Sequence, residues 1–314
     1  MVWDILFLLV GFVLLIKGAD FFVDGSSSIA KHIGIPGFVI GLTVVAMGTS
    51  APEAAVSITA GIEGSNALAI SNVIGSNMFN LMVVAGICAV IKPYKIEKVM
   101  LRRDFPVNIV ANVLLLVLMI VGSSLGLIDG LALLLLFVGY LIWVLVMAFR
   151  NRDSADDGED IKKMSPVLSV IAIIGGLAAV IFGGQLVVDN ATSIAQTMGL
   201  SETFIGLTIV AIGTSLPELV TSIVAARKGE SGLALGNVVG SNIFNLLLIL
   251  GLSSAISPIV VNFDAVINTI ILIAVTLSVY VACLFKEGMG RIVGGVCVSG
   301  YVVYTAYLLM NAAA

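Results

Sequence analysis

The sequence has few charged residues and a single histidine. Asp, Glu, Lys and Arg make up 11% of its 314 residues, whereas hydrophobic residues make up 60% and the mean hydropathy is +1.18. So few polar side chains cannot coat a soluble globule of this size, and the composition places the chain in a bilayer. The net charge of −4 says little about binding partners, because five of the acids fall in the short stretch 153–160. Nothing in the charge distribution supports nucleic-acid binding.

Cysteine pairs and a basic leader are also missing. Cys88, Cys283 and Cys297 lie in apolar runs without a CxxC pair, so we expect buried thiols rather than disulfides or metal ligands. The N-terminus lacks the basic region of a cleaved signal peptide, and we expect it to be retained. No Ser/His pair, paired aspartates or HExxH motif appears in the apolar runs, so we expect no enzyme activity.

Apolar runs predict an all-α membrane protein with ten transmembrane helices. Each run is about 20 residues or longer, enough to cross roughly 30 Å of hydrocarbon. The runs lie near residues 3–30, 36–60, 66–91, 105–122, 126–149, 167–195, 202–226, 232–257, 264–286 and 291–311. The polar stretch between the fifth and sixth runs predicts a first five-helix repeat at 1–149, a cytoplasmic linker at 150–166 and a second repeat at 167–314.

The basic residues give an orientation. If the N-terminus is outside, the loops on the inner side hold 14 of the 15 Lys and Arg residues, and no outer loop holds one. Lys and Arg in short loops collect on the cytoplasmic side. We therefore predict a multi-pass protein of the cell (plasma or inner) membrane with both termini outside.

Two polar motifs each occur twice. Gly41-LTVVAMGTSAP-Glu53 recurs as Gly206-LTIVAIGTSLP-Glu218, and Asn72-VIGSNMF-Asn80 recurs as Asn237-VVGSNIF-Asn245, always 165 residues apart. Because each half has an odd number of spans, the second copy must enter the membrane from the opposite side. Such an inverted repeat is typical of transporters and predicts that the two glutamates meet near the midplane.

Each repeat holds a carboxylate beside a helix break. A charged residue at the bilayer centre costs about 2.5 kcal/mol or more on insertion scales, so an intramembrane acid indicates a functional site. Pro52 and Pro217 cannot donate to the helix ladder, which predicts free carbonyl oxygens near Ala46 to Gly48 and at the matching place. Oxygen-bearing side chains follow at spacings of four: Thr49, Glu53 and Ser57; Thr214, Glu218 and Ser222; Asn72, Ser76 and Asn80; and Asn237, Ser241 and Asn245.

The donors in these four segments are hard oxygens. Carboxylates, hydroxyls, amide oxygens and carbonyls are present, without His, Cys, Lys or Arg. Such a set suits Ca²⁺ or Na⁺ and disfavours Zn²⁺ or Cu²⁺. Two ionised glutamates neutralise one Ca²⁺ or are compensated by several Na⁺, so one site can hold either in turn.

The two GTSxPE segments, the two GSNxFN segments and the five-plus-five layout resemble the Ca²⁺/cation antiporter superfamily, particularly the prokaryotic Na⁺/Ca²⁺ exchangers. The resemblance covers nearly the whole chain. It implies Na⁺/Ca²⁺ antiport by alternating access, sliding of the first and sixth helices, a monomeric transport unit and no cofactor besides the transported ions. It places Ca²⁺ between Glu53 and Glu218 with the backbone oxygens of Thr49 and Thr214. It places Na⁺ at flanking sites that also use Ala46, Ser50, Ser76, Ala211, Ser215 and Ser241, with Asn80 and Asn245 lining the centre.

Several alternatives stay open at the level of sequence. A Ca²⁺/H⁺ antiporter would use the same glutamates for protons, and a passive cation channel would also need oxygen ligands. K⁺-dependent relatives carry an aspartate where this chain has Asn245, which argues against K⁺ co-transport, although some K⁺-independent microbial relatives also have an acid there. Asp24 and Asp189 suit either structural pairing or ion entry, and Asp20 is matched by Gln185. The residues Ser57, Ser222, Asn72 and Asn237 suit either interhelical hydrogen bonds or ligation.

Overall fold

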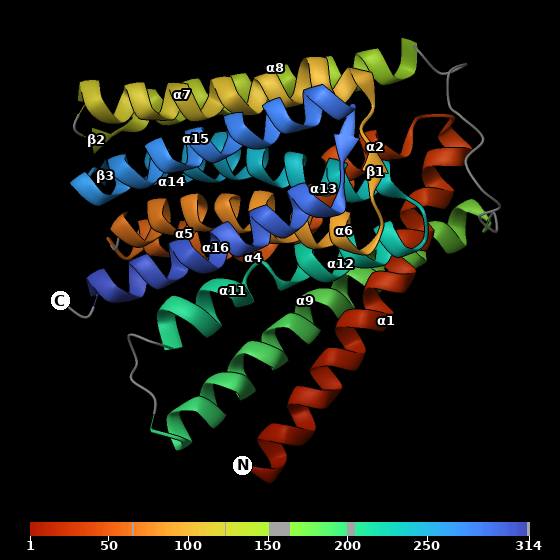
Figure 1. The fold of residues 1–314 in the computed structure, drawn as a ribbon, viewed down its shortest axis with the longest axis horizontal. Coiled ribbons are helices and arrows are strands. Elements are labelled where there is room, and N and C mark those ends of the chain that lie inside the picture. Colours follow the sequence, from red (N-terminus) through yellow and green to blue (C-terminus); the bar gives the residue numbers. More distant parts are fainter. Residues whose placement is uncertain (65, 123, 151–163, 200–204, 313–314) are drawn as a thin grey trace.

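Long apolar helices make up the protein (Figure 1), and its computed structural model describes residues 1–64, 66–122, 124–150, 164–199 and 205–312. Seven helical stretches in these ranges are long and apolar enough to cross a membrane. The bent pair Gly37–Thr49 and Ala51–Ile62, with 49° between its parts, adds an eighth. The chain is therefore a multi-pass membrane protein, and most of the predicted linker lies outside the described residues.

The elements follow the chain in the same order in both halves. The first half contains α1 (Val2–Ile33), α2 (Gly37–Ile40), η1 (Gly41–Val45), α3 (Ala46–Thr49), α4 (Ala51–Ile62), α5 (Asn66–Phe79), η2 (Asn80–Val84), α6 (Ala85–Ile91), β1 (Tyr94–Lys95), η3 (Met100–Asp104), α7 (Phe105–Gly122), β2 (Ser124–Leu125) and α8 (Leu127–Arg150). The second half contains α9 (Pro166–Thr197), η5 (Gly206–Val210), α11 (Ala211–Gly213), α12 (Leu216–Arg227), α13 (Ser231–Phe244), η6 (Asn245–Ile249), α14 (Leu250–Ile256), β3 (Ile259–Val260), α15 (Phe263–Lys286), β4 (Gly288–Met289) and α16 (Arg291–Ala312). Segments labelled η are π-helical.

Two of the predicted spans are not among these candidates. The seventh is interrupted between α11 and α12, and the residues 200–204 before it are outside the description. The tenth is α16, a helix of 22 residues, in which Arg291–Ala306 counts as a shorter apolar helix. The described residues thus contain seven to eight candidate spans by length and composition.

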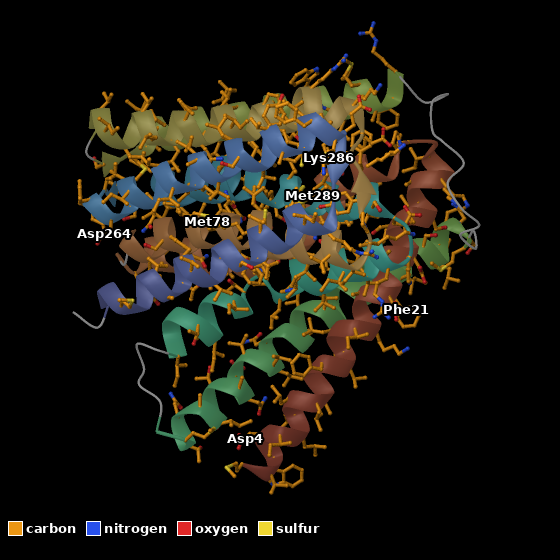
Figure 2. The ribbon with its side chains drawn as sticks, viewed as in Figure 1. Asp4, Phe21, Met78, Asp264, Lys286 and Met289 are labelled. Carbon is orange, nitrogen blue, oxygen red and sulfur yellow. The ribbon has the colours of Figure 1, made fainter. Side chains whose placement is uncertain are left out.

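Apolar side chains cover the outside of the bundle. Phe21 projects outward from α1 (Figure 2) and is 59% exposed. Leu135 on α8 and Ile292 on α16 are likewise exposed. The helix α13, in contrast, is buried along nearly its whole length, because other helices surround it. This inside-out distribution is the one that a hydrocarbon solvent favours.

The helices α1 and α9 lie side by side and are inclined to the rest of the bundle (Figure 1). Their contact surface is made of glycines seven residues apart. A Cβ atom added at Gly11 would lie 2.9 Å from the carbonyl oxygen of Gly183, and one at Gly18 would lie 2.8 Å from that of Gly176. Small residues allow such close backbone approach between membrane helices.

We expect Gly176→Ala to destabilise the protein, because the new methyl group would lie 2.5 Å from the backbone nitrogen of Phe22. Overpacking of this kind costs about 1–3 kcal/mol. The neighbouring Gly175 is the matched control, since a Cβ there meets nothing within 4 Å. Thermal unfolding in detergent should give a lower melting temperature for Gly176→Ala only; equal melting temperatures would contradict the close helix contact.

Two short antiparallel strand pairs join the halves. Strand β1 pairs with β4, with Tyr94 opposite Met289, and β2 pairs with β3, with Leu125 opposite Ile259. Strands β1 and β2 lie in the first half and β3 and β4 in the second, so each pair joins the two halves. Because Tyr94 of β1 and Ile259 of β3 are 165 residues apart, β1 and β3 are equivalent strands, and the two pairs are reciprocal.

One sequence expectation was wrong at the start of the fourth span. Arg102 and Arg103 were expected in a loop, but both lie in η3, and Arg103 is buried. Its Nε and Nη2 atoms donate to the carboxylate of Asp104 at 2.8 and 3.1 Å, and the Tyr140 hydroxyl donates to the same carboxylate at 2.9 Å. A buried charge is tolerated when it is paired and hydrogen-bonded in this way.

Candidate cation-binding site

The two glutamates of the repeated motifs lie at the N-terminal ends of α4 and α12, directly after a helix break. The breaks are at Ser50 (φ −81°, ψ 9°) and Ser215 (φ −93°, ψ 8°), with Pro52 and Pro217 in the first turns of the helices that follow. Both glutamate side chains are fully buried. The positive end of a helix dipole favours a carboxylate at this position. The predicted helix breaks are confirmed.

Reciprocal hydrogen bonds bring the two glutamates together. Ser50 donates to Oε1 of Glu218 at 2.8 Å, and Ser215 donates to Oε1 of Glu53 at 2.9 Å. Each carboxylate is thus held by the serine of the segment that carries the other carboxylate. The hydroxyls of Ser76 and Ser241 lie within 3.4 Å of Glu53 and 3.5 Å of Glu218, respectively.

Four buried oxygen atoms around this centre receive no hydrogen bond from the described residues. They are Oε2 of Glu53, Oε2 of Glu218, Oδ1 of Asn80 and Oδ1 of Asn245. Buried polar atoms nearly always have a partner, because an unpaired one costs its full desolvation free energy. All four are acceptors, and two belong to acids. A cation is the kind of partner that would satisfy the whole set.

Hydrogen bonds to two further asparagines fix the orientation of the Asn80 and Asn245 amides. Asn80 donates through Nδ2 to Oδ1 of Asn242 at 3.2 Å, and Asn245 donates through Nδ2 to Oδ1 of Asn77 at 3.0 Å. Asn77 and Asn242 in turn donate to each other's backbone carbonyl oxygens at 3.2 and 3.3 Å. Since each Nδ2 is engaged, Oδ1 of Asn80 and of Asn245 is left as the acceptor.

Asn77 and Asn242 were missed by the sequence analysis, although the repeated GSNxFN motif contains them. Residues at spacings of four share one face of a regular α-helix, and Asn77 and Asn242 do not belong to that face. Asn80 and Asn245, however, each begin a π-helical segment, η2 and η6. Segments of this type often occur at functional sites. The duplication of Asn77 at the 165-residue offset was the available signal.

The two threonines and Ala46 have unequal surroundings. Thr49 is fully buried and donates to the carbonyl oxygen of Val45 at 3.1 Å and to Oδ1 of Asn237 at 3.0 Å, whereas Oγ1 of Thr214 makes no hydrogen bond with the residues that the structure describes. The carbonyl of Ala46 is not freed as expected, because the Ser50 N–H donates to it at 3.1 Å. The break comes after Thr49, so the last turn of α3 stays closed.

Two further expectations concern residues at the edge of the site. Ala211, expected among the Na⁺ ligands, is the first residue of α11. Asn72 donates to the Ser57 hydroxyl at 2.9 Å, and Asn237 donates to the Ser222 hydroxyl at 3.0 Å. These four side chains therefore make hydrogen bonds between neighbouring helices, which is one of the two interpretations that the sequence left open.

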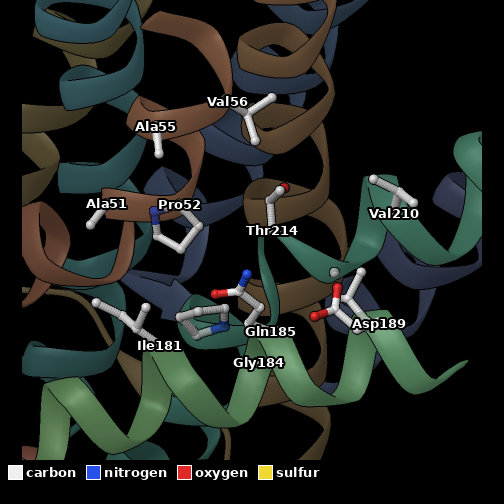
Figure 3. A pocket seen from close by; sticks show the side chains of 13 residues that line it. Ala51, Pro52, Ala55, Val56, Ile181, Gly184, Gln185, Asp189, Val210 and Thr214 are labelled. Carbon is white, nitrogen blue, oxygen red and sulfur yellow. The ribbon is translucent and has the colours of Figure 1, made fainter. Parts of the chain in front are cut away.

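A cavity of about 360 Å³ is lined by Pro52 and Pro217, the residues that precede the two glutamates, although neither glutamate lines it. Figure 3 shows Gln185 and Asp189, both from α9, next to Pro52 and Thr214. The remaining wall comes from η5, α11, α4 and α12. Within the described residues no three His, Cys, Asp or Glu side chains gather into a metal site.

Comparison with known proteins gives consistent matches over the whole chain. The family model described as sodium/calcium exchanger protein matches residues 3–146 and 168–310. The protein CaxA of Alkalimonas amylolytica is 37% identical over 98% of each chain. The sodium/calcium exchanger MaX1 of Methanosarcina acetivorans is 34% identical over 97% of this chain and 98% of its own. A structure of the sodium-calcium exchanger NCX_Mj soaked with Na⁺ and Ca²⁺ matches with a TM-score of 0.86 at 33% identity, covering 98% of each chain.

Proposed function

The chain belongs to the sodium/calcium exchanger protein family, and from this premise we propose that it exchanges Na⁺ for Ca²⁺ across the cell membrane by alternating access. The ions bind in turn between α4 and α12. Two buried carboxylates from the two halves provide the negative charge, and neutral oxygens complete the coordination. The transport unit is a single chain, and it needs no cofactor.

The observation that carries the proposal is the set of four unpartnered oxygens. Oε2 of Glu53, Oε2 of Glu218 and the Oδ1 atoms of Asn80 and Asn245 are buried and accept no hydrogen bond from the described residues. Carboxylate and carbonyl-type oxygens are the ligands that Ca²⁺ prefers. An uncompensated pair of buried acids is expensive, so a cation in this place stabilises the folded protein as well as the site.

We assign the ligands as follows. Ca²⁺ lies between Glu53 and Glu218 with the backbone oxygens of Thr49 and Thr214. Na⁺ takes flanking positions that use the same carboxylates. The other Na⁺ ligands are Ala46, Ser50, Ser76, Ala211, Ser215 and Ser241. Because both ions need the same two charges, binding of several Na⁺ excludes Ca²⁺, and this competition couples the two gradients.

The same proposal includes the topology. Ten spans form two inverted repeats, 1–149 and 167–314, with both termini outside and the linker 150–166 in the cytoplasm. Support comes from the hydrogen bonds and strand pairs, which occur in reciprocal sets 165 residues apart. A pseudo-two-fold axis in the membrane plane would relate such sets.

The two sides of the site differ in exposure. Val210 and Val45 are counterparts 165 residues apart, but Val210 is 41% exposed and Val45 is fully buried. Thr214 and Thr49 differ in the same direction. We infer that the cavity lined by Asp189 gives access to the site from one face, which is the open side, whereas Val45 and Thr49 on the α1 side are buried. With the proposed topology, the open side is the outer one.

Flux measurements test the function. In proteoliposomes with an outward Na⁺ gradient, the protein should accumulate ⁴⁵Ca²⁺, and uptake should vanish when Na⁺ is replaced by choline. Uptake driven by a pH gradient without Na⁺ would instead establish a Ca²⁺/H⁺ antiporter, and dependence on K⁺ would establish K⁺ co-transport. Flux without any counter-ion would establish a channel and refute exchange.

The serines allow the Na⁺ positions to be tested separately. Ser50→Ala and Ser215→Ala each remove a hydroxyl that contacts the opposite carboxylate at 2.8–2.9 Å. A hydrogen bond to a charged group is worth about 1.5–3 kcal/mol, which corresponds to roughly tenfold or more in an equilibrium constant. We expect the Na⁺ concentration for half-maximal exchange to rise by about this factor, with a smaller change for Ca²⁺. Ser278 lies on an exposed face of α15 and donates to the Ala274 carbonyl of its own helix, so Ser278→Ala is the control. Equal effects on both ions would contradict separate Na⁺ positions.

A further inference from the structure

Lys228 makes the most extensive ion pair that joins α1 to another helix. It follows the last residue of α12, and its Nζ atom lies 2.7 Å from Oδ1 of Asp24 and 3.4 Å from Oδ1 of Asp20. The same Nζ donates to the backbone carbonyl of Asp20 at 3.1 Å. A lysine ammonium has three donors, so these contacts use its whole capacity. Neither acid is needed for the cation site described above.

This ion pair crosses the boundary between two parts of the fold. Asp20 and Asp24 belong to α1, which packs along α9 through closely approaching glycines. Lys228 belongs to the turn between α12 and α13, in the part that carries Glu218. On this side Val23, Val45 and Thr49 are buried, with at most 1% exposure.

The opposite side has the reverse chemistry. At the 165-residue offset the counterpart of Lys228 is Glu63, that of Asp24 is Asp189, and that of Asp20 is Gln185. Neither Glu63 nor Asp189 makes an ion pair with any described residue. Where the α1 side has the ion pair of Lys228, this side has the cavity of about 360 Å³ that Asp189 lines. One side thus carries a lysine paired with two acids, and the other carries Asp189 at the wall of a cavity without an ion pair to any described residue.

We propose that Lys228 is a tethered cation that closes the α1-side entrance by occupying the carboxylates of Asp20 and Asp24. This inference rests on the proposed exchange function, which requires that the α1 side open. For that side to open, α1 must separate from the α12–α13 turn, and the ammonium must leave both carboxylates. A Ca²⁺ or Na⁺ ion arriving from this side meets the two acids only after Lys228 has released them. Lys228 is therefore a positioning residue that acts on access, and it makes the two faces of the protein unequal.

The test measures access to both sides without any transported ion. Val45→Cys reports on the α1 side and Val210→Cys on the Asp189 side, and the native cysteines Cys88, Cys283 and Cys297 are buried. Labelling by a small methanethiosulfonate reagent is followed in detergent, in buffer free of Na⁺ and Ca²⁺. A half-exposed ion pair shifts a two-state equilibrium by up to about fivefold. Lys228→Gln should therefore speed labelling of the cysteine at 45 by up to about fivefold and slow labelling at 210.

Three companion variants make the result specific. Lys228→Arg should keep the wild-type labelling rates, because it keeps the charge. Asp24→Asn should behave like Lys228→Gln, because it removes the other partner. Arg227→Gln, which removes an exposed positive charge one residue away, should change neither rate. Unchanged labelling at 45 in both Lys228→Gln and Asp24→Asn, or an equal change in Arg227→Gln, would overturn the proposal.

The proposed function and the role of Lys228 fail in different ways. Labelling is measured without an ion gradient, so it reports on the entrance alone. Absence of Na⁺-driven ⁴⁵Ca²⁺ uptake by the wild-type chain would refute exchange whatever the labelling shows. Normal uptake together with unchanged labelling in the Lys228 and Asp24 variants would refute only the role of Lys228.

Discussion

Replacing either buried glutamate by glutamine should abolish Na⁺-driven ⁴⁵Ca²⁺ uptake. Glutamine keeps the shape of the side chain and its acceptor oxygen but removes one of the two charges that balance Ca²⁺. Removing one partner of a buried charge pair costs about 3–5 kcal/mol, so Ca²⁺ affinity should fall by at least about 100-fold. Because Glu53 and Glu218 occupy equivalent positions, we expect equally severe losses from Glu53→Gln and Glu218→Gln.

A control separates loss of the site from loss of the fold. Glu63 ends α4 on an exposed turn, so Glu63→Gln removes the same charge from the same helix and should transport normally. Without ions, Glu53→Gln should be at least as stable as the wild type, because it removes a buried charge that has no counter-charge. What it should lose is the rise in melting temperature that Ca²⁺ produces in the wild type. Wild-type uptake by either buried-site variant would refute the assignment.

The second large effect is expected from the asparagines that lie behind the site. Asn242→Leu removes the acceptor that holds Nδ2 of Asn80, so the Asn80 amide can turn and present a donor to the cation. Loss of a residue that orients a metal ligand typically costs 10–100-fold in affinity. We therefore expect ⁴⁵Ca²⁺ binding to weaken by about this factor in Asn242→Leu and in Asn77→Leu.

The asparagine prediction also has a matched control. Asn190 is on α9 and, among the described residues, donates only to the Leu186 carbonyl of its own helix at 2.7 Å. Asn190→Leu should leave Ca²⁺ binding unchanged. Because Asn77 and Asn242 act through Asn245 and Asn80, adding Asn242→Leu to Asn80→Leu should cause little further loss. Fully additive losses would show that Asn242 does not act through Asn80.

Much of the fold was predictable from the sequence because a bilayer leaves few choices. Every backbone polar group must be satisfied within hydrocarbon, so long apolar runs become helices. The duplicated motifs also predicted that Glu53 and Glu218 meet, since an inverted repeat places equivalent residues of the two halves near one another at the midplane, and a buried carboxylate indicates a functional site. Both expectations follow from the high cost of burying polar groups, which local sequence displays directly.

Other features depend on contacts that a single sequence does not display. The mutual hydrogen bonds of Asn77 and Asn242 need two helices at a particular depth and rotation. The π-helical segments at Asn80 and Asn245 change which residues face the centre, and a period of 3.6 does not anticipate them. The burial of Arg103 depends on its ion pair with Asp104 and on Tyr140 from another helix. A single sequence does not show these contacts, so Arg103 was expected in a loop rather than in a helix.

The difference between the two sides was also beyond the sequence. The repeats are nearly equivalent in sequence at Thr49 and Thr214, yet only Thr49 is fully buried. Two conformations of one chain share every residue, so the choice between them rests on small free-energy differences. Lys228 shows where such a difference arises, because its counterpart Glu63 has the opposite charge.

Equilibrium binding of ⁴⁵Ca²⁺ to the purified protein, titrated with Na⁺, tests most directly that one pair of carboxylates serves both ions. We predict that Na⁺ displaces all bound Ca²⁺ with a Hill coefficient above one, since several Na⁺ replace a single Ca²⁺. Glu53→Gln and Glu218→Gln should each abolish the displaceable binding. Calcium that stays bound in saturating Na⁺, or that binds equally well to both variants, would contradict a shared site.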